Sequence, residues 1–159
     1  VMNVIESSTM EHDSRHARAY LMRICTQATI NELERAIAAV GLPEVVEDIR
    51  PPERGLVMIR GRAGGDGQSF NVGEASVTRA AVRLPGGIGG FAYIMGRDLK
   101  KARIAAIIDA LGQSTDMRNK LETVLVAPVV ERVEREKDIR RRQTAATRVE
   151  FFTLVRGED

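Results

Sequence analysis

The chain has 159 residues, of which 43% are apolar and 29% charged, so it is long enough for one folded domain and global disorder is excluded. Its formal net charge of only +2 gives no reason to expect a nucleic-acid-binding protein. No apolar run reaches the roughly 18–20 residues that a membrane-spanning helix needs, and residues 1–11 lack a signal-peptide pattern. Cys25 is the only cysteine, which excludes an internal disulfide and favours a reducing compartment, so we expect a cytoplasmic protein.

The first third of the chain has the apolar spacing of helices. We expect residues 1–11 to be disordered and a helix to begin near His12. A second helix follows, because Thr29 and Glu32 form a capping-box pattern, and it ends at Gly41. One face of the first helix carries its apolar side chains, which are Ala17, Leu21, Ile24, Cys25 and Ala28.

The middle of the chain predicts strands that are separated by turns. The expected strands are 45–50, 55–63, 69–72, 75–84 and 90–95. Proline or glycine residues mark the turns, at 51–52, 64–67, 73 and 85–87. Such short connections indicate antiparallel pairing, because a parallel crossover needs roughly a dozen residues or more.

The C-terminal half predicts helices followed by one more strand. Asp98 caps a helix with an isoleucine-rich stripe, and a second helical stretch covers 117–125. A charged helix then starts at Pro128 and ends near residue 143. Residues 148–155 form an expected last strand that is apolar on both faces and must therefore be covered on both. Two of its side chains are candidates for the core or for a subunit interface, namely Phe151 and Phe152.

The whole pattern predicts the α+β class. We expect a central, mainly antiparallel sheet with flanking helices at the N-terminus and in the C-terminal half. No linker or internal repeat interrupts the pattern, so residues 1–159 are expected to form a single domain.

Two patterns are similar to known sites but lack essential parts of them. His12 and His16 are four residues apart on a predicted helix, a spacing that can bind a metal, but we favour two exposed side chains. The glycine loop at 64–67 has neither the lysine nor the following helix of a phosphate-binding loop, so we interpret it as a hairpin turn. We therefore predict no metal site and no catalytic residue in this chain.

Arginines on the predicted strands are the main candidate functional residues. Side chains alternate along a strand, so Arg60 and Arg62 share one face, and two further arginines share a face of another strand. If these strands are neighbours with matching faces, four guanidinium groups crowd together and need carboxylates or an anion. The candidates for anion binding or subunit contact are Arg60, Arg62, Arg79, Arg83 and Arg97. The carboxylates of the chain that could pair with them are Glu53, Asp66 and Glu74. We expect Arg79 and Arg83 to be mostly buried and paired, within the chain or across a subunit contact.

Several short segments between residues 55 and 157, about two thirds of the chain, are specific in combination. They are GLV at 55–57, GGDG at 64–67 followed by Phe70, GEA at 73–75, TRAAVRL at 78–84, GRD at 96–98, IDAL at 108–111 and VEFFTLVRG at 149–157. Together they resemble the G subunit of bacterial carbon–phosphorus lyase, the machinery that breaks down phosphonates.

The resemblance implies a subunit that acts with the H, I and L subunits, with the I subunit as the closest expected contact. Together these subunits displace adenine from ATP with methylphosphonate, which gives ribose 1-methylphosphonate 5-triphosphate. A J subunit with an iron–sulfur cluster and S-adenosylmethionine later cleaves the carbon–phosphorus bond. The chain alone is then expected to bind no cofactor and to be inactive, with no nucleic-acid or membrane partner. Two alternatives are a stand-alone arginine-rich module that binds anions or nucleotides, and a weak enzyme.

Overall fold

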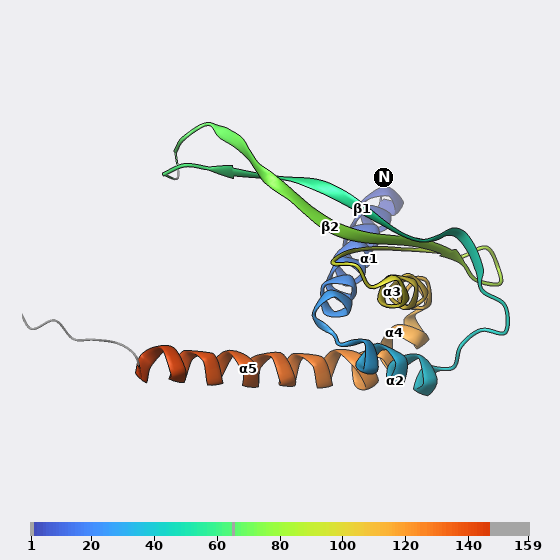
Figure 1. Cartoon of the computed structure of the whole chain (residues 1–159). Helices are drawn as coiled ribbons and strands as arrows, with labels where there is room; N and C mark the ends of the chain where they lie inside the picture. The colour runs from blue at the N-terminus through green and yellow to red at the C-terminus, as the bar shows by residue number, and fades with distance from the viewer. Residues whose placement is uncertain (1, 65, 147–159) are drawn as a thin grey trace, which may run out of the picture.

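The chain folds into one three-stranded antiparallel sheet with helices on one of its faces, which confirms the predicted α+β class. The computed structural model describes residues 2–64 and 66–146, and side chains from residue 15 onward. Its elements are α1 (Met2–Gln27), α2 (Ile30–Val40), β1 (Glu47–Arg62), β2 (Ser69–Arg83), β3 (Gly89–Met95), α3 (Leu99–Leu111), α4 (Thr115–Leu121), the π-helical turn η1 (Glu122–Val126) and α5 (Ala127–Ala146). Figure 1 shows α3 beneath the sheet, with α2, α4 and α5 in a further layer below it.

Small side chains bring α3 close to the inner face of the sheet. Ala80 of β2 lies opposite Ala92 of β3, and both are buried. Residues 105–111 of α3 are buried all round, because the sheet covers one side of the helix and α2 packs against another. The closest approach is at Gly90, where an added Cβ atom would lie 2.0 Å from the backbone oxygen of Ala106. Only glycine fits at this position.

A buried carboxylate joins α1, α3 and the edge strand β3. Asp109 is 2% exposed and accepts two hydrogen bonds from Arg18, both of 2.6 Å. The backbone N–H of Phe91 donates a third bond of 2.8 Å to the same carboxylate. The side-chain bond to Asp109 raises the pKa of Arg18 above its ordinary value, so this guanidinium group stays charged. Residues 91 positions apart in the sequence are thereby held together.

A second ionic contact joins α5 to the junction of α1 and α2. The predicted capping box is confirmed, since the Thr29 hydroxyl accepts from the backbone N–H of Glu32 and the Glu32 carboxylate accepts from the backbone N–H of Thr29. The same carboxylate accepts a bond of 2.8 Å from Arg132 of α5. Arg132 also donates to the backbone oxygen of Gln27 at 2.8 Å. Glu32 therefore caps one helix and anchors another.

The strands are longer than predicted. β1 continues through Pro51 and Pro52, and β2 continues through Gly73, so the turns expected at these positions do not exist. β1 is an edge strand with register shifts between residues 48 and 53, and edge positions and bulges are where a strand tolerates proline. The glycine loop after β1 is the predicted hairpin turn, in which Gly67 donates to the backbone oxygen of Ala63 at 3.1 Å.

The helices also differ from their predicted bounds. α1 begins at Met2, so residues 2–11, expected to be disordered, are helical; no glycine or proline interrupts the chain before Gly41. α4, η1 and α5 follow one another without a break, and the π-helical turn lies where Pro128 cannot donate to the preceding turn. The expected strand at 148–155, with Phe151 and Phe152, lies outside the described residues and stays a prediction.

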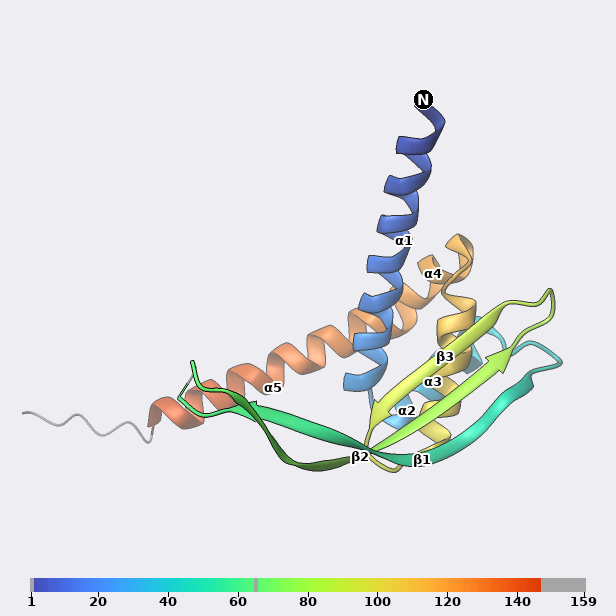
Figure 2. The same ribbon diagram turned by 90° about the horizontal axis from the view of Figure 1, so that it is seen from above.

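The hairpin of β1 and β2 extends well beyond the rest of the sheet. β3 pairs only with residues 77–83 of β2, so residues 56–62 and 69–76 form a two-stranded ribbon, which we call the arm. Figures 1 and 2 show that the arm and the distal end of α5 project to the same side of the body. In both views no helix of the described part of the chain covers the arm. None of the described helices combines the length and the hydrophobicity needed to span a membrane.

The close approach at Gly90 generates a stability prediction. We expect Gly90→Ala to lower the free energy of unfolding by about 1–3 kcal/mol or more, because the new methyl group overlaps α3. Gly73→Ala is the matched control, since nothing lies within 4 Å of a Cβ atom at that position. Urea denaturation of both variants measures the difference. Equal stability of the two variants would contradict the close packing of α3 on β3.

The contact between Glu32 and Arg132 predicts a pH dependence. Burial acts to raise the pKa of Glu32, but hydrogen bonds from Arg132 and Thr29 outweigh burial and hold the pKa below its ordinary value of 4.5. A carboxyl group whose pKa is depressed by folding contributes stability above its ordinary value, and this stability is lost as pH falls through the folded-state pKa. We expect Glu32→Gln to lower the free energy of unfolding by about 1–3 kcal/mol at pH 7 and by progressively less below pH 4.5.

Equilibrium unfolding over this pH range tests the prediction, with the exposed Glu44→Gln as the control. A destabilisation by Glu32→Gln that is as large in acid as at pH 7 would show that the charge of Glu32 is not responsible.

Candidate functional site

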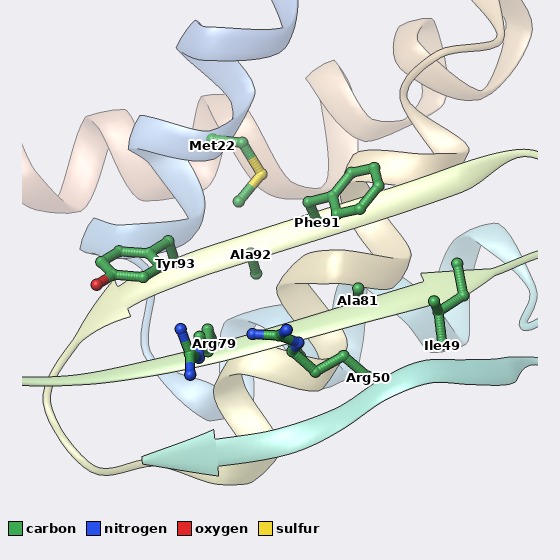
Figure 3. A pocket seen from close by; sticks show the side chains of 9 residues that line it. Met22, Ile49, Arg50, Arg79, Ala81, Phe91, Ala92 and Tyr93 are labelled. Atoms are coloured by element: carbon green, nitrogen blue, oxygen red, sulfur yellow. The ribbon is translucent and has the colours of Figure 1, made fainter. Parts of the chain in front are cut away.

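The outer face of the sheet carries a wide groove that no helix of the described chain covers. The groove has a volume of about 730 Å³. Figure 3 shows Phe91 and Tyr93 on β3, Arg79 on β2 and Arg50 on β1 around it. The complete lining is Met22, Ile49, Arg50, Arg79, Ala80, Ala81, Phe91, Ala92 and Tyr93.

Successive side chains of β3 point to opposite faces of the sheet, which explains why the outer face is both apolar and exposed. The side chains of Ala92 and Ile94 point towards α3 and are buried, so their neighbours point the other way. Phe91, Tyr93 and Met95 are 56%, 55% and 70% exposed. Covering one such side chain fully contributes roughly 1.5–3 kcal/mol. A partner that covers this face would therefore gain considerable binding energy.

The charged side of the groove is an ion-paired cluster. Glu53 accepts from Arg79 at 2.6 Å and from Arg50 at 3.2 Å, and Arg83 pairs with Glu47 at 3.4 Å. Arg79 was predicted to be paired, and Glu53 is one of the partners proposed for it. The predicted burial of Arg79 and Arg83 is wrong within this chain, because their side chains are 46% and 49% exposed. They project from the sheet face that no helix covers.

The four strand arginines do not form one cluster. In the β1–β2 register Arg60 lies opposite Asn71 and Arg62 opposite Ser69, whereas Arg79 lies opposite Glu53. A strand rises about 3.3 Å per residue, and Asn71 is eight residues from Arg79 along β2, so the two pairs of arginines are at least roughly 25 Å apart along the hairpin. Arg60 and Arg62 belong to the arm, and Arg79 and Arg83 belong to the body of the sheet.

Arg97 has a different role from the other candidate arginines. Its Nε atom donates to the Ser76 hydroxyl at 3.1 Å, and its backbone oxygen accepts from Arg54 at 3.0 Å. The next residue, Asp98, caps α3 as predicted. Arg97 therefore lies at the junction of β3 and α3 and does not line the groove.

The arm is the second exposed apolar surface. Its large apolar side chains are 41–62% exposed, and they are Leu56, Met58, Ile59, Phe70 and Val72. A two-stranded ribbon with no packing on either face is only marginally stable in water. The arm therefore has the character of a segment that a partner covers.

The described residues contain neither a reactive cysteine nor a cluster that could bind a metal. Burial raises the pKa of the Cys25 thiol to about 12, so this cysteine is an inert core residue. Among the residues that the structure describes, no three histidine, cysteine or carboxylate side chains come together in a way that could hold a metal. The side chain of His12 lies outside the described side chains, and His16 is exposed on α1.

Two features of the structure could not be predicted from the sequence. Residues 90–95 are apolar or small at every position, so alternation could not show which of them face outwards. Asp109 did carry a signal, since a carboxylate within the apolar run of α3 must find a partner. Nothing in the sequence identified that partner as Arg18.

Comparison with known proteins adds what the geometry does not contain. The family model described as phosphonate metabolism protein PhnG matches residues 16–157 of the chain. The alpha-D-ribose 1-methylphosphonate 5-triphosphate synthase subunit PhnG of Rhizobium meliloti (strain 1021) is 48% identical over 138 residues. The aligned part is 87% of this chain and 88% of that protein.

The exposed ion pair of the groove makes a testable prediction. We expect Arg79→Ala to lower the free energy of unfolding of the isolated chain by less than about 1 kcal/mol, because exposed pairs are well solvated. A double-mutant cycle with Glu53→Ala should give a coupling energy of the same size that decreases with added salt. Thermal melting at low and high salt provides both values. A salt-independent coupling energy above about 2 kcal/mol would show that the pair is buried in solution.

Proposed function

The chain belongs to the PhnG family of phosphonate metabolism proteins, and on that premise we propose that it is a subunit of a ribose 1-methylphosphonate 5-triphosphate synthase without an active site of its own. The second half of this proposal rests mainly on two large uncovered apolar surfaces. In addition, the described residues contain no cluster that could hold a metal, and their one cysteine is buried. Such surfaces are typical of chains whose folded form is completed by partners.

The reaction proposed for the assembly is a transfer of the ribose triphosphate group of ATP to methylphosphonate. The bond between C1′ of the ribose and adenine breaks, a bond from C1′ to a phosphonate oxygen forms, and adenine leaves. The H, I and L subunits are the proposed partners in this step. The J subunit is proposed to cleave the carbon–phosphorus bond later, with its iron–sulfur cluster and S-adenosylmethionine. We propose that this chain itself binds no cofactor. We also propose that it acts in the cytoplasm, because Cys25 is a free thiol and thiols stay reduced in that compartment.

Two surfaces are proposed for these partners. The groove on the outer sheet face offers aromatic side chains beside the ion-paired cluster, which suits a protein surface with an apolar centre and a polar rim. The arm offers apolar side chains on both of its faces and projects beyond the body together with α5. A partner held between the arm and α5 would cover surface that this chain leaves to solvent.

The alternative of a stand-alone anion-binding module using the strand arginines receives no support from the geometry. Arg79 and Arg83 are already ion-paired with Glu53 and Glu47, and Arg60 and Arg62 lie far from them.

Activity of the separated components tests the first part of the proposal. We expect the purified chain to release no adenine from ATP in the presence of methylphosphonate, and the co-expressed assembly to release it. Adenine can be quantified by chromatography. The proposal would be contradicted if the isolated chain released adenine and a substitution within the chain abolished this release.

Substitutions in the arm test the interface. We expect Leu56→Ser with Met58→Ser to reduce co-purification of the partner subunits at least tenfold, while the isolated chain loses less than about 1 kcal/mol of stability because both side chains are exposed. Leu42→Ser with Val45→Ser is the matched control, with exposed apolar side chains outside the arm. If the arm variant recovered as much of the partner subunits as the wild type, the arm would not be part of the interface.

A further inference from the structure

One face of the arm carries a small apolar cluster near the turn of the hairpin. Phe70 lies opposite Gly61 in the β1–β2 register, and Ile59 is two residues before Gly61, so Ile59 and Phe70 share a face. Val72 lies on that face too, because a Cβ atom at Gly61 would lie 2.8 Å from its Cγ2 atom. The three side chains are 41%, 50% and 60% exposed in the order Ile59, Phe70 and Val72, and we call them the tip cluster.

The arm also has an open strand edge beside this cluster. β3 pairs with β2 from Val77 onward, and just beyond it the backbone N–H of Gly96 donates to the backbone oxygen of Ser76 at 2.8 Å. Residues 69–75 of β2 continue past β3, and no strand of the described residues lies on that side of them. An open edge next to exposed apolar side chains offers both backbone hydrogen bonds and apolar contacts to an added strand.

The chain itself contains a segment with matching chemistry. α5 ends at Ala146 and the sequence ends at residue 159, so 13 residues follow α5. The expected last strand, residues 148–155, lies within them, and we call it the tail. Five of its eight side chains are apolar, and it has neither glycine nor proline. Such a composition favours a strand, and its apolar side chains on both faces need to be covered.

The tail has too short a connection to lie along the arm of its own chain. α3 separates the layer of the sheet, which the arm continues, from the layer of α5 (Figure 1). Neighbouring layers pack roughly 10 Å apart, so the arm and α5 are roughly 20 Å apart. Residue 147 alone connects α5 to the tail, and an extended residue spans only about 3.5 Å. The arm that the tail can follow over its whole length therefore belongs to another molecule.

The same arrangement leaves room for the arm of a second copy. The arm and the distal end of α5 project to the same side of the body, in different layers. A two-stranded ribbon is one layer thick, so it fits between them. Each copy then offers a tail and an arm on the same side, and a two-fold axis uses both surfaces twice.

We propose that two copies of this chain exchange their tails, with each tail added as a strand to the β2 edge of the other copy's arm and covering its tip cluster. The inference deepens the proposed function, from which it takes only the arm as an interface. It names a second copy as the molecule that meets one face of the arm. Leu56 and Met58 are at odd spacings from Ile59, so they point to the opposite face and stay available to other subunits.

The oligomeric state of the purified full chain tests the exchange. Light scattering coupled to size-exclusion chromatography over a range of concentrations should show a dimer. We expect Phe151→Ser with Phe152→Ser in the tail to raise the dimer dissociation constant about tenfold or more, and Phe70→Ser with Val72→Ser in the tip cluster to do the same. Thermal melting checks that each variant is folded, and the single variants Phe70→Ser and Phe151→Ser replace a double variant that folds poorly.

A control and a mixing experiment make the test specific. Leu56→Ser with Met58→Ser removes two exposed apolar side chains from the other face of the arm and should leave the dimer unchanged. The tail variant keeps an intact arm, and the tip-cluster variant keeps an intact tail. A mixture of the two therefore regains one of the two exchanged contacts, and we expect it to dimerise at concentrations at which each variant alone is a monomer.

The failure of this inference is distinguishable from that of the proposed function. A wild-type chain that is monomeric at every concentration, a dimer that neither variant weakens, or a mixture without recovery of the dimer would overturn the exchange. Adenine release and recovery of partner subunits are measured on the co-expressed assembly. A chain that exchanges tails but recovers no partner subunits would refute the proposed function and leave the exchange in place.

Discussion

The arrangement of α1, α3 and the sheet depends on the hydrogen bonds of one buried carboxylate, that of Asp109. Transfer of a carboxylate out of water costs several kcal/mol, and this cost is offset only when its oxygens are well bonded. Here a bidentate arginine from α1 and a backbone N–H from β3 provide those bonds. The position of α1 relative to the sheet is therefore set by one charged group in the buried and otherwise apolar second half of α3, residues 105–111.

Several features of the surface follow from this contact. Arg18 is held close to the ring of Phe91, with 5.9 Å between its guanidinium carbon and the ring centre. Arg15 lies on the same helix and lines a small pocket beside α4 together with Gly112 and Arg118. The bond to Phe91 also occupies a backbone donor of β3, which is an edge strand and would otherwise offer that donor to another chain. One buried charge thus helps to shape the groove, the pocket and the edge of the sheet.

The described part of the molecule is stabilised unevenly, and this unevenness fits a subunit. The core between α3 and the inner sheet face is closely packed, whereas the outer face and the arm leave large apolar side chains in solvent. α5 also projects from the body, but it carries its own ion pairs along the helix, such as Lys137 with Glu134 at 2.6 Å. A polar helix of this kind needs no partner for its stability, whereas an apolar ribbon such as the arm gains from one.

Most of the local elements and the family could be predicted from short residue patterns. The capping box at Thr29, the helix that begins after Asp98, the glycine hairpin and the antiparallel pairing all depend on residues close together in the chain, where spacing and turn chemistry act directly. The motifs that resemble the carbon–phosphorus lyase G subunit are local in the same sense, and the family is confirmed.

The strand register, the choice of the covered sheet face and the partners of the charged side chains depend on tertiary contacts. Register separates Arg60 from Arg79, although both lie on strands with suitable faces. Residues 90–95 are apolar or small throughout, so the position of α3, and not alternation, decides that Phe91 and Tyr93 face outwards. Asp109 pairs with Arg18, which is 91 residues away in the sequence. Each of these outcomes depends on contacts between segments far apart in the sequence, and periodicity within one segment carries no information about them.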